Sequence, residues 1–214
     1  NNMDIKHIST VLSNPILVNE PMRSHTTFGI GGDASCYVHP ENRAELSELL
    51  IYCNKRHIPI FFAGSGSNLL VSDTGFDGVI ISIRKTFKSL NIDSDGTIKV
   101  EAGVMLGNMV KNATKAGISG LESLIGVPGT VGGALIMNAG AFGGEISNYF
   151  QSATVVTMKG ETKKYTTDQI SFSYRSSTFP KDEILIDATF KCEFGKADKI
   201  DADKQAASKL RKEN

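Results

Sequence analysis

The sequence has no net charge and no long apolar run. Its 214 residues include 23 lysines plus arginines and 23 aspartates plus glutamates. Without an excess of positive charge, nothing in the composition draws the chain to nucleic acid or to an anionic membrane surface. No stretch approaches the roughly 18 apolar residues that cross a bilayer. We therefore expect neither a nucleic-acid nor a membrane partner, and the oligomeric state stays open.

Cysteine is scarce, and the usual residues of metal and hydrolase sites are not arranged for that chemistry. The three cysteines, Cys36, Cys53 and Cys192, are far apart and odd in number, which is typical of a reduced, cytoplasmic protein and not of a disulfide framework. The four histidines all occur by His57 without the spacing of a zinc site. No serine stands in a Gly-x-Ser-x-Gly elbow. We expect no metal and no serine triad.

The hydrophobic pattern predicts two consecutive α+β units that meet near residues 84–88, without internal repeats. Asn42 is a plausible helix N-cap, and Asp95-Gly96 suits a tight hairpin. The expected elements are a helix after Asn42, strands at 58–63 and 78–83, a hairpin over 90–104, a helix over 106–117, a hairpin over 153–165, a strand over 183–194 and a polar helix over 198–214. We expect that last helix to lack a packing partner.

Two glycine-rich loops follow or precede strands in the first unit. Gly64 to Asn68 (Gly-Ser-Gly-Ser-Asn) ends a strand, and its backbone N–H groups and hydroxyls suit a diphosphate. It lacks the Lys-Ser/Thr of a Walker loop, and an ordinary serine-glycine turn is the alternative. Gly29 to Ala34 matches G-x-G-x-x-A, but a strand follows where a Rossmann fingerprint needs a helix. We interpret it as a tight turn.

The second unit contains the densest glycine segment and an arginine among aromatic residues. Residues 126–134 and 138–144 expose many backbone donors with little side-chain bulk, which suits a flat ring system and its phosphates. Their glycine density forbids a routine helix or strand throughout. Arg175 follows Tyr174, and its guanidinium can bind a carboxylate or a phosphate at two points, with a surface salt bridge as the alternative.

The motifs, taken in order, resemble one enzyme family. They are Ala63 to Leu70 (AGSGSNLL), Gly126 to Ala134 (GVPGTVGGA), Asn138 to Ala141 (NAGA) and Tyr174 to Ser177 (YRSS), with Arg23 to Gly32 as an opening motif. This series is similar to the UDP-N-acetylmuramate dehydrogenase family, also called UDP-N-acetylenolpyruvoylglucosamine reductase, from about Asn19 onward.

The resemblance implies an α+β, two-subdomain FAD-binding fold of the vanillyl-alcohol oxidase and p-cresol methylhydroxylase type. NADPH is then the hydride donor, and a UDP-sugar enolpyruvyl ether in peptidoglycan synthesis is the substrate. The implied division is an N-terminal tail (1–18), FAD-binding subdomains (19–86 and 87–195) and the start of a third domain (196–214). Arg175 is the expected catalytic residue, with Tyr174 as a second substrate contact. The expected cofactor contacts are Gly64, Ser65, Gly66, Ser67, Asn68, Leu69, Gly126, Val127, Pro128, Gly129, Thr130, Gly132, Gly133, Ala134, Asn138 and Gly140.

The chain departs from the family pattern at its end. The family's proton-donating serine, in a Gly-Ser-x-Phe context, and a glutamate near the carboxyl end have no counterpart before Asn214. We therefore expect FAD binding with weak or absent turnover. The alternatives are another FAD oxidase of the same fold and a non-catalytic nucleotide-binding module.

Overall fold

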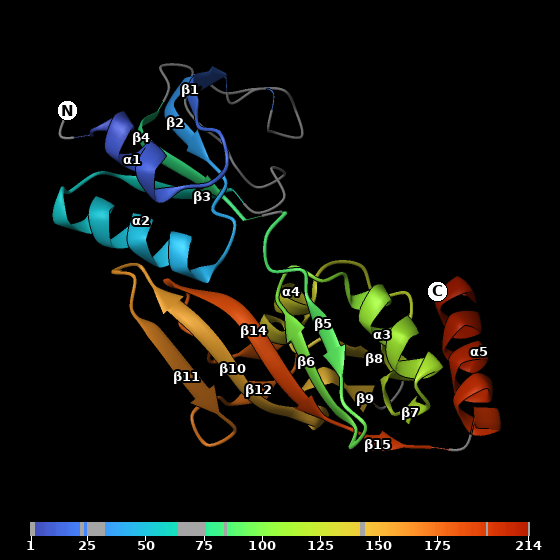
Figure 1. Ribbon diagram of the computed structural model, residues 1–214. Coiled ribbons are helices and arrows are strands. Elements are labelled where there is room, and N and C mark those ends of the chain that lie inside the picture. The colour runs from blue at the N-terminus through green and yellow to red at the C-terminus, as the bar shows by residue number, and fades with distance from the viewer. Residues whose placement is uncertain are drawn as a thin grey trace. The chain divides into compact units, whose positions relative to one another are not determined.

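A computed structural model gives the fold (Figure 1). It describes residues 3–21, 24, 33–63, 76–83, 85–141, 144–195 and 197–213. The chain forms two compact units, which are taken one at a time here: Asn1–Thr86 with Val156–Thr162, and Phe87–Val155 with Lys163–Asn214. Both units combine helices with strands, which confirms the expected α+β class.

The first unit is built on a four-stranded mixed sheet. Its elements are α1 (Ile5–Val11), β1 (Leu17–Pro21), β2 (Asp33–Val38), α2 (Arg43–Lys55), β3 (Ile60–Ala63) and β4 (Phe76–Ser82). The strand order is β1-β2-β4-β3, in which β2, β4 and β3 run parallel and β1 runs antiparallel to β2. The strand predicted at 78–83 is thus confirmed as β4, and the one predicted at 58–63 as β3.

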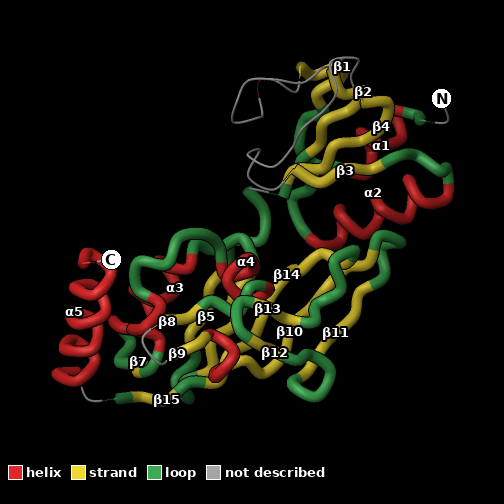
Figure 2. Tube along the Cα trace, turned by 180° about the vertical axis from the view of Figure 1, so that it is seen from behind, coloured by secondary structure: helices red, strands yellow, loops and turns green. Residues whose placement is uncertain are grey.

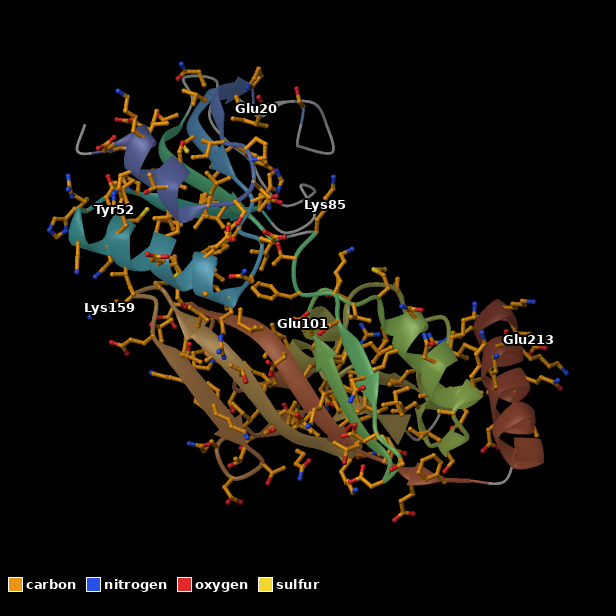
Figure 3. The ribbon with its side chains drawn as sticks, viewed as in Figure 1. Glu20, Tyr52, Lys85, Glu101, Lys159 and Glu213 are labelled. Atoms are coloured by element: carbon orange, nitrogen blue, oxygen red, sulfur yellow. The ribbon has the colours of Figure 1, made fainter. Side chains whose placement is uncertain are left out.

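Helix α2 begins where its capping chemistry predicts. The Asn42 side chain accepts a hydrogen bond from the Glu45 N–H at 2.9 Å. The Glu45 carboxylate in turn accepts from the N–H and the hydroxyl of Ser13, at 2.9 and 2.8 Å. Tyr52 projects from α2 beside α1 (Figure 3), where its hydroxyl oxygen accepts from the Asp4 N–H at 3.0 Å. These contacts fix α1 to α2.

The second unit contains most of the remaining elements, and its main sheet has the order β11-β10-β14-β6-β5. The elements are β5 (Leu90–Ile92), β6 (Thr97–Glu101), α3 (Leu106–Lys115), β7 (Ile118–Ser119), η2 (Leu121–Leu124), α4 (Val131–Ile136), β8 (Gly140–Ala141), β9 (Gly144–Glu145), η3 (Ile146–Tyr149), β10 (Phe150–Thr157), β11 (Thr162–Thr166), β12 (Phe172–Ser173), β13 (Ser176–Ser177), β14 (Glu183–Lys191), β15 (Glu193–Phe194) and α5 (Ala197–Glu213).

Two local predictions in this unit are confirmed. Strands β5 and β6 form the hairpin around Gly96, whose φ of 88° is in the left-handed region that glycine favours. Helix α3 buries one face, and Gly117 follows it with a φ of 85°, as a C-cap glycine does. The buried residues of α3 are the predicted ones, Leu106, Met109, Val110 and Ala113.

Helix α5 does not lack a packing partner, so that expectation is wrong. It is a polar helix of 17 residues that packs on η2. Ala207 is buried, and the Arg211 guanidinium donates to the Ser123 carbonyl at 3.3 Å. The sparse apolar pattern concealed this contact, because an arginine stem supplies part of it. Among the described helices, none has both the length and the apolar character needed to span a bilayer.

Candidate functional site

The glycine segment 126–134 is not helical throughout, but its last residues, from Val131, begin a short helix. Helix α4 begins after Thr130, whose hydroxyl accepts from the Gly133 N–H at 3.2 Å. The N–H groups at the start of α4 bond outside the helix: Val131 N–H donates to Val104 O at 2.8 Å and Gly132 N–H to Ala102 O at 3.0 Å. Tertiary hydrogen bonds therefore outweigh the low helix propensity of glycine here.

Glycine is needed at different positions of this segment for different physical reasons. Glu101 marks the end of β6 (Figure 3), and Gly132 packs on the next residue: an added Cβ would lie 2.9 Å from the Ala102 Cβ. Gly126 and Gly129 have φ angles of 78° and 103°, which favour glycine. Of the remaining predicted contacts, Pro128, Gly129 and Gly133 are exposed, Val127 and Thr130 are half-buried, and Ala134 is buried.

The chain after α4 turns tightly at Asn138 and Gly140. Asn138 is 3% exposed and has a φ of 47°, a left-handed conformation that asparagine tolerates. Gly140 pairs with Glu145 in the β8–β9 ladder, and an added Cβ would lie 2.5 Å from the Gly144 carbonyl oxygen. The close approach of the two backbones therefore explains glycine at 140, and no ligand is needed to account for it.

Tyr174 and Arg175 form the turn between β12 and β13. The ladder pairs Phe172 with Ser177 and Ser173 with Ser176, so only two residues connect the strands. Arg175 has a φ of 50°, and both turn residues are exposed, Tyr174 to 84%. The guanidinium carbon lies 5.8 Å from the centroid of the Tyr174 ring. Within the described part of the chain no ion pair of Arg175 is found, so the salt-bridge alternative has no support there.

Aromatic packing anchors this turn in the core of the unit. Phe172 lies before the turn and Phe179 after it, and each ring meets Phe150 edge to face, with centroids 5.3 and 6.0 Å apart. Phe179 also meets Tyr165 at 6.3 Å. The exposed turn therefore projects from a rigid base.

The β12–β13 turn lies against the end of α4, which Figure 2 shows beside β13. The Ser177 hydroxyl donates to the Ile136 carbonyl at 2.6 Å, and the Asn138 amide donates to the Ser173 carbonyl at 2.9 Å. The structure thus brings Asn138 and the Tyr174–Arg175 turn together. Ser177 belongs to a motif noted in the sequence, but nothing in the sequence indicated its partner.

Some predicted residues lie outside the described residues: Gly64, Ser65, Gly66, Ser67, Asn68 and Leu69, as well as the turn at Gly29 to Gly32. The strand before the first group, β3, ends at the buried Ala63 as expected. The proposed diphosphate cradle at 64–68 therefore stays a prediction.

The cysteines and the metal-binding side chains offer no competing chemistry in the described regions. All three cysteines are free and buried. Burial raises the pKa of Cys36 to about 11, that of Cys53 to about 12 and that of Cys192 to about 11. These thiols are therefore protonated at neutral pH and are not nucleophiles. No group of three or more His, Cys, Asp or Glu residues suited to a metal ion occurs among residues 3–21, 24, 33–63, 76–83, 85–141, 144–195 and 197–213.

Comparisons with known proteins show what the whole chain is similar to. The profile of the FAD binding domain family matches residues 34–166. The UDP-N-acetylenolpyruvoylglucosamine reductase of Syntrophomonas wolfei is 38% identical over 199 residues, which cover 92% of this chain and 66% of that protein. The chain spans 57% to 66% of the length of such curated relatives.

Solved structures show the same relationship. The UDP-N-acetylenolpyruvylglucosamine reductase of Thermus caldophilus is 31% identical and has a TM-score of 0.67, with 94% of this chain and 70% of that chain covered. The 6-hydroxy-D-nicotine oxidase of Arthrobacter nicotinovorans, 14% identical, has a TM-score of 0.59 over 86% of this chain and 43% of that chain, a likeness in fold alone. Together they confirm the expected FAD-binding fold of the vanillyl-alcohol oxidase type.

Proposed function

Because the chain belongs to the UDP-N-acetylenolpyruvoylglucosamine reductase family and to the FAD binding domain family, we propose that it binds FAD and acts in the NADPH-dependent reduction of a UDP-sugar enolpyruvyl ether. The substrate is UDP-N-acetylglucosamine enolpyruvate and the product is UDP-N-acetylmuramate, a precursor of peptidoglycan. The reaction takes place in the cytoplasm. Its product serves cell-wall growth, and through it cell shape and division.

The observation that carries this proposal is the conformation of Arg175. A two-residue turn with a positive φ at its second position is easiest for glycine or asparagine, yet an arginine with a φ of 50° stands there. Such strain costs of order 1–3 kcal/mol and tends to occur at functional sites. Arg175 is exposed on a turn that is hydrogen-bonded to the end of α4, so its guanidinium is available for an anionic ligand.

The described residues of the glycine segment fit FAD. Pro128, Gly129 and Gly133 are exposed, and added Cβ atoms at the two glycines would meet open space apart from Thr130 Oγ1 at 3.5 Å from position 133. Bare backbone of this kind allows a flat ring or a phosphate to approach closely. When bound, FAD supplies hydride transfer from NADPH to the substrate double bond. Gly64 to Leu69, which lie outside the described residues, stay FAD contacts predicted from the sequence.

Arg175 binds the substrate carboxylate in this proposal. Its guanidinium donates two parallel N–H groups to the two carboxylate oxygens. Hydride addition increases the negative charge on the enolate-like carboxylate, so the same contact is stronger in the transition state than in the ground state. Tyr174 lies beside Arg175 as a second contact, with its ring centroid 5.8 Å from the guanidinium carbon.

The first test is the colour and redox behaviour of the purified chain. We expect FAD uptake, visible as the flavin absorption bands, and bleaching of those bands by NADPH without oxygen. In a longer polypeptide that spans the full length of the curated relatives, reoxidation by UDP-N-acetylglucosamine enolpyruvate should exceed reoxidation by oxygen. Faster reoxidation by oxygen alone would point to an oxidase, and a chain that takes up no FAD would contradict the proposal.

The second test replaces Arg175. In a longer polypeptide that spans the full length of the curated relatives, Arg175→Met should take up FAD and be bleached by NADPH like its unmodified parent, while reoxidation by the sugar nucleotide slows by about 10²–10³-fold, the typical cost of one charge-stabilising donor. Arg175→Lys keeps the charge and loses the two-point geometry, so its rate should be intermediate. Unchanged reoxidation in Arg175→Met would remove Arg175 from the mechanism.

A further inference from the structure

The Tyr174–Arg175 turn is held on both of its sides by side-chain hydrogen bonds to the end of α4. Before the turn, the Ser173 carbonyl accepts from the Asn138 amide at 2.9 Å. After the turn, the Ser177 hydroxyl donates to the Ile136 carbonyl at 2.6 Å. These two bonds, called here the clasp, join segments 35 and 41 residues apart in the sequence. The glycine segment continues into α4, and the clasp joins the end of that helix to the turn that carries Arg175.

The Asn138 side chain is committed to protein partners. Its amide nitrogen also donates to Glu145 Oε2 at 3.1 Å, and its carbonyl oxygen accepts from the Ser147 N–H at 3.4 Å. An asparagine amide has two hydrogens to donate, and both have protein acceptors here. With 3% of the residue exposed, the side chain has no N–H left for a ligand. This geometry favours a structural link at Asn138 over the cofactor contact that the sequence suggested.

The geometry points to a positioning role for both residues: we propose that Asn138 and Ser177 couple the FAD seat at Gly126 to Ala134 to the turn that carries Arg175, so that FAD binding orders Arg175. The inference rests on the proposed function, because it takes FAD as the ligand of the glycine segment. When bound, FAD would hold the backbone that leads into α4; Ile136 is the last residue of that helix, and Asn138 lies two residues beyond it. Through the two hydrogen bonds of the clasp, a more ordered end of α4 would restrict the β12–β13 hairpin as well.

A hairpin with two paired residues on each side depends on such support. Short isolated hairpins are marginal in water, and the positive φ of Arg175 weakens this one further. Its base is fixed by Phe172 and Phe179 and by hydrogen bonds between Ser171 and Thr178, whereas the turn itself is held, among the described residues, by the clasp and its own ladder. Loss of one clasp bond should therefore increase opening of the turn by about 3- to 10-fold.

The experiment measures amide hydrogen exchange of peptides covering residues 171–178 by mass spectrometry, with and without FAD. It uses the 214-residue chain and the variants Asn138→Gly, Ser177→Ala and the double variant. Glycine at 138 keeps the left-handed backbone at low cost and removes only the side chain. Ser176→Ala is the matched control, since Ser176 is exposed, adjacent to Ser177, and makes no side-chain hydrogen bond found among the described residues. FAD affinity is measured in parallel by flavin fluorescence.

In the unmodified chain and in Ser176→Ala, FAD should slow exchange across residues 174–177 by at least about 3-fold. The double variant should bind FAD with a Kd within about 3-fold of the unmodified chain, and its exchange should no longer respond to FAD. Such loss of response is a change in coupling between two sites, which simple destabilisation does not produce. Ser177→Ala alone should show a partial loss, which keeps the test available if Asn138→Gly does not fold.

Two results would overturn the inference while leaving the proposed function intact. One is FAD-dependent slowing that persists in the double variant. The other is a fall in FAD affinity of more than about 10-fold in Asn138→Gly with unchanged exchange at 174–177, which would make Asn138 a cofactor contact. Absence of FAD uptake by the unmodified chain would instead overturn the proposed function, and the inference with it.

Discussion

Two adjacent glycines in α4 show how one residue type serves different purposes. Gly132 is buried against Ala102, and an added Cβ there would lie 2.9 Å from the Ala102 Cβ and 3.2 Å from its carbonyl oxygen. Gly133 is exposed, and the nearest atom to its added Cβ is Thr130 Oγ1 at 3.5 Å. Packing therefore explains glycine at 132, whereas the fold alone does not require it at 133.

This difference predicts opposite effects of alanine at the two positions. Gly132→Ala should destabilise the chain by about 1–3 kcal/mol, the usual cost of overpacking. Gly133→Ala should leave stability unchanged or raise it by up to about 1 kcal/mol, because alanine favours helix, and should weaken FAD binding. Urea unfolding of the two variants checks the first point and flavin fluorescence the second. Equal destabilisation by both would contradict the packing argument.

Tyr165 gives the chain a pH-sensitive contact. Its hydroxyl donates to the Glu183 carboxylate, and this bond, together with burial, raises the pKa of Tyr165 to about 12 from its ordinary value of 10. A pKa raised on folding means that the protonated form stabilises the folded chain. The hydrogen bond from Tyr165 to Glu183 therefore contributes fully to the free energy of unfolding below pH 10, and this contribution is lost as the pH rises to 12.

Tyr165→Phe isolates this contribution. The difference in unfolding free energy between the unmodified chain and Tyr165→Phe should be constant from pH 7 to 9 and shrink between pH 10 and 12. Groups far from Tyr165 that titrate in this range are common to both proteins and cancel in the difference. A difference that stays constant through pH 12 would show that the Glu183 contact does not hold the tyrosine proton.

At the scale of elements, α5 supports the loop that leads into the glycine segment. The Arg211 side chain crosses Gly126, whose added Cβ would lie 2.6 Å from Arg211 Cδ, and its guanidinium reaches the Ser123 carbonyl. The stem thus covers backbone while the charged end makes a hydrogen bond. The position of residues 123–126 therefore depends on a helix that is about 80 residues later in the sequence.

Removal of this side chain should loosen α5. We expect Arg211→Ala to lower stability by about 1–2 kcal/mol, the sum of a lost hydrogen bond and lost packing, and to speed amide exchange in peptides from α5 and η2. Lys212→Ala changes an exposed neighbour in the same helical turn and should have little effect. Equal behaviour of the two variants would show that α5 is not held through Arg211.

At the scale of the whole molecule, FAD binding should appear as increased stability. A ligand that binds only the folded chain stabilises it by about 2.7 kcal/mol at 100 times its Kd. Thermal unfolding followed by circular dichroism should therefore shift upward with FAD concentration. Riboflavin lacks the diphosphate and adenosine and should give a smaller shift at equal concentration. No shift with FAD would contradict the proposed seat.

The sequence alone was sufficient wherever local chemistry decides structure. The Asn42 cap, the Gly96 hairpin and the apolar face of α3 depend on residues a few positions apart, and all three are found as predicted. The order of the motifs also determined the family, because several short patterns in series are far more specific than one.

Only the tertiary structure decided how the candidate site is held together. The helical start of α4 depends on hydrogen bonds to Ala102 and Val104, and the partners of Asn138 and Arg211 lie 35 and 88 residues away. Such contacts leave no local pattern, since each depends on where another segment of the chain passes. The sequence therefore determined which residues could do chemistry, and the fold determined which of them are held in place.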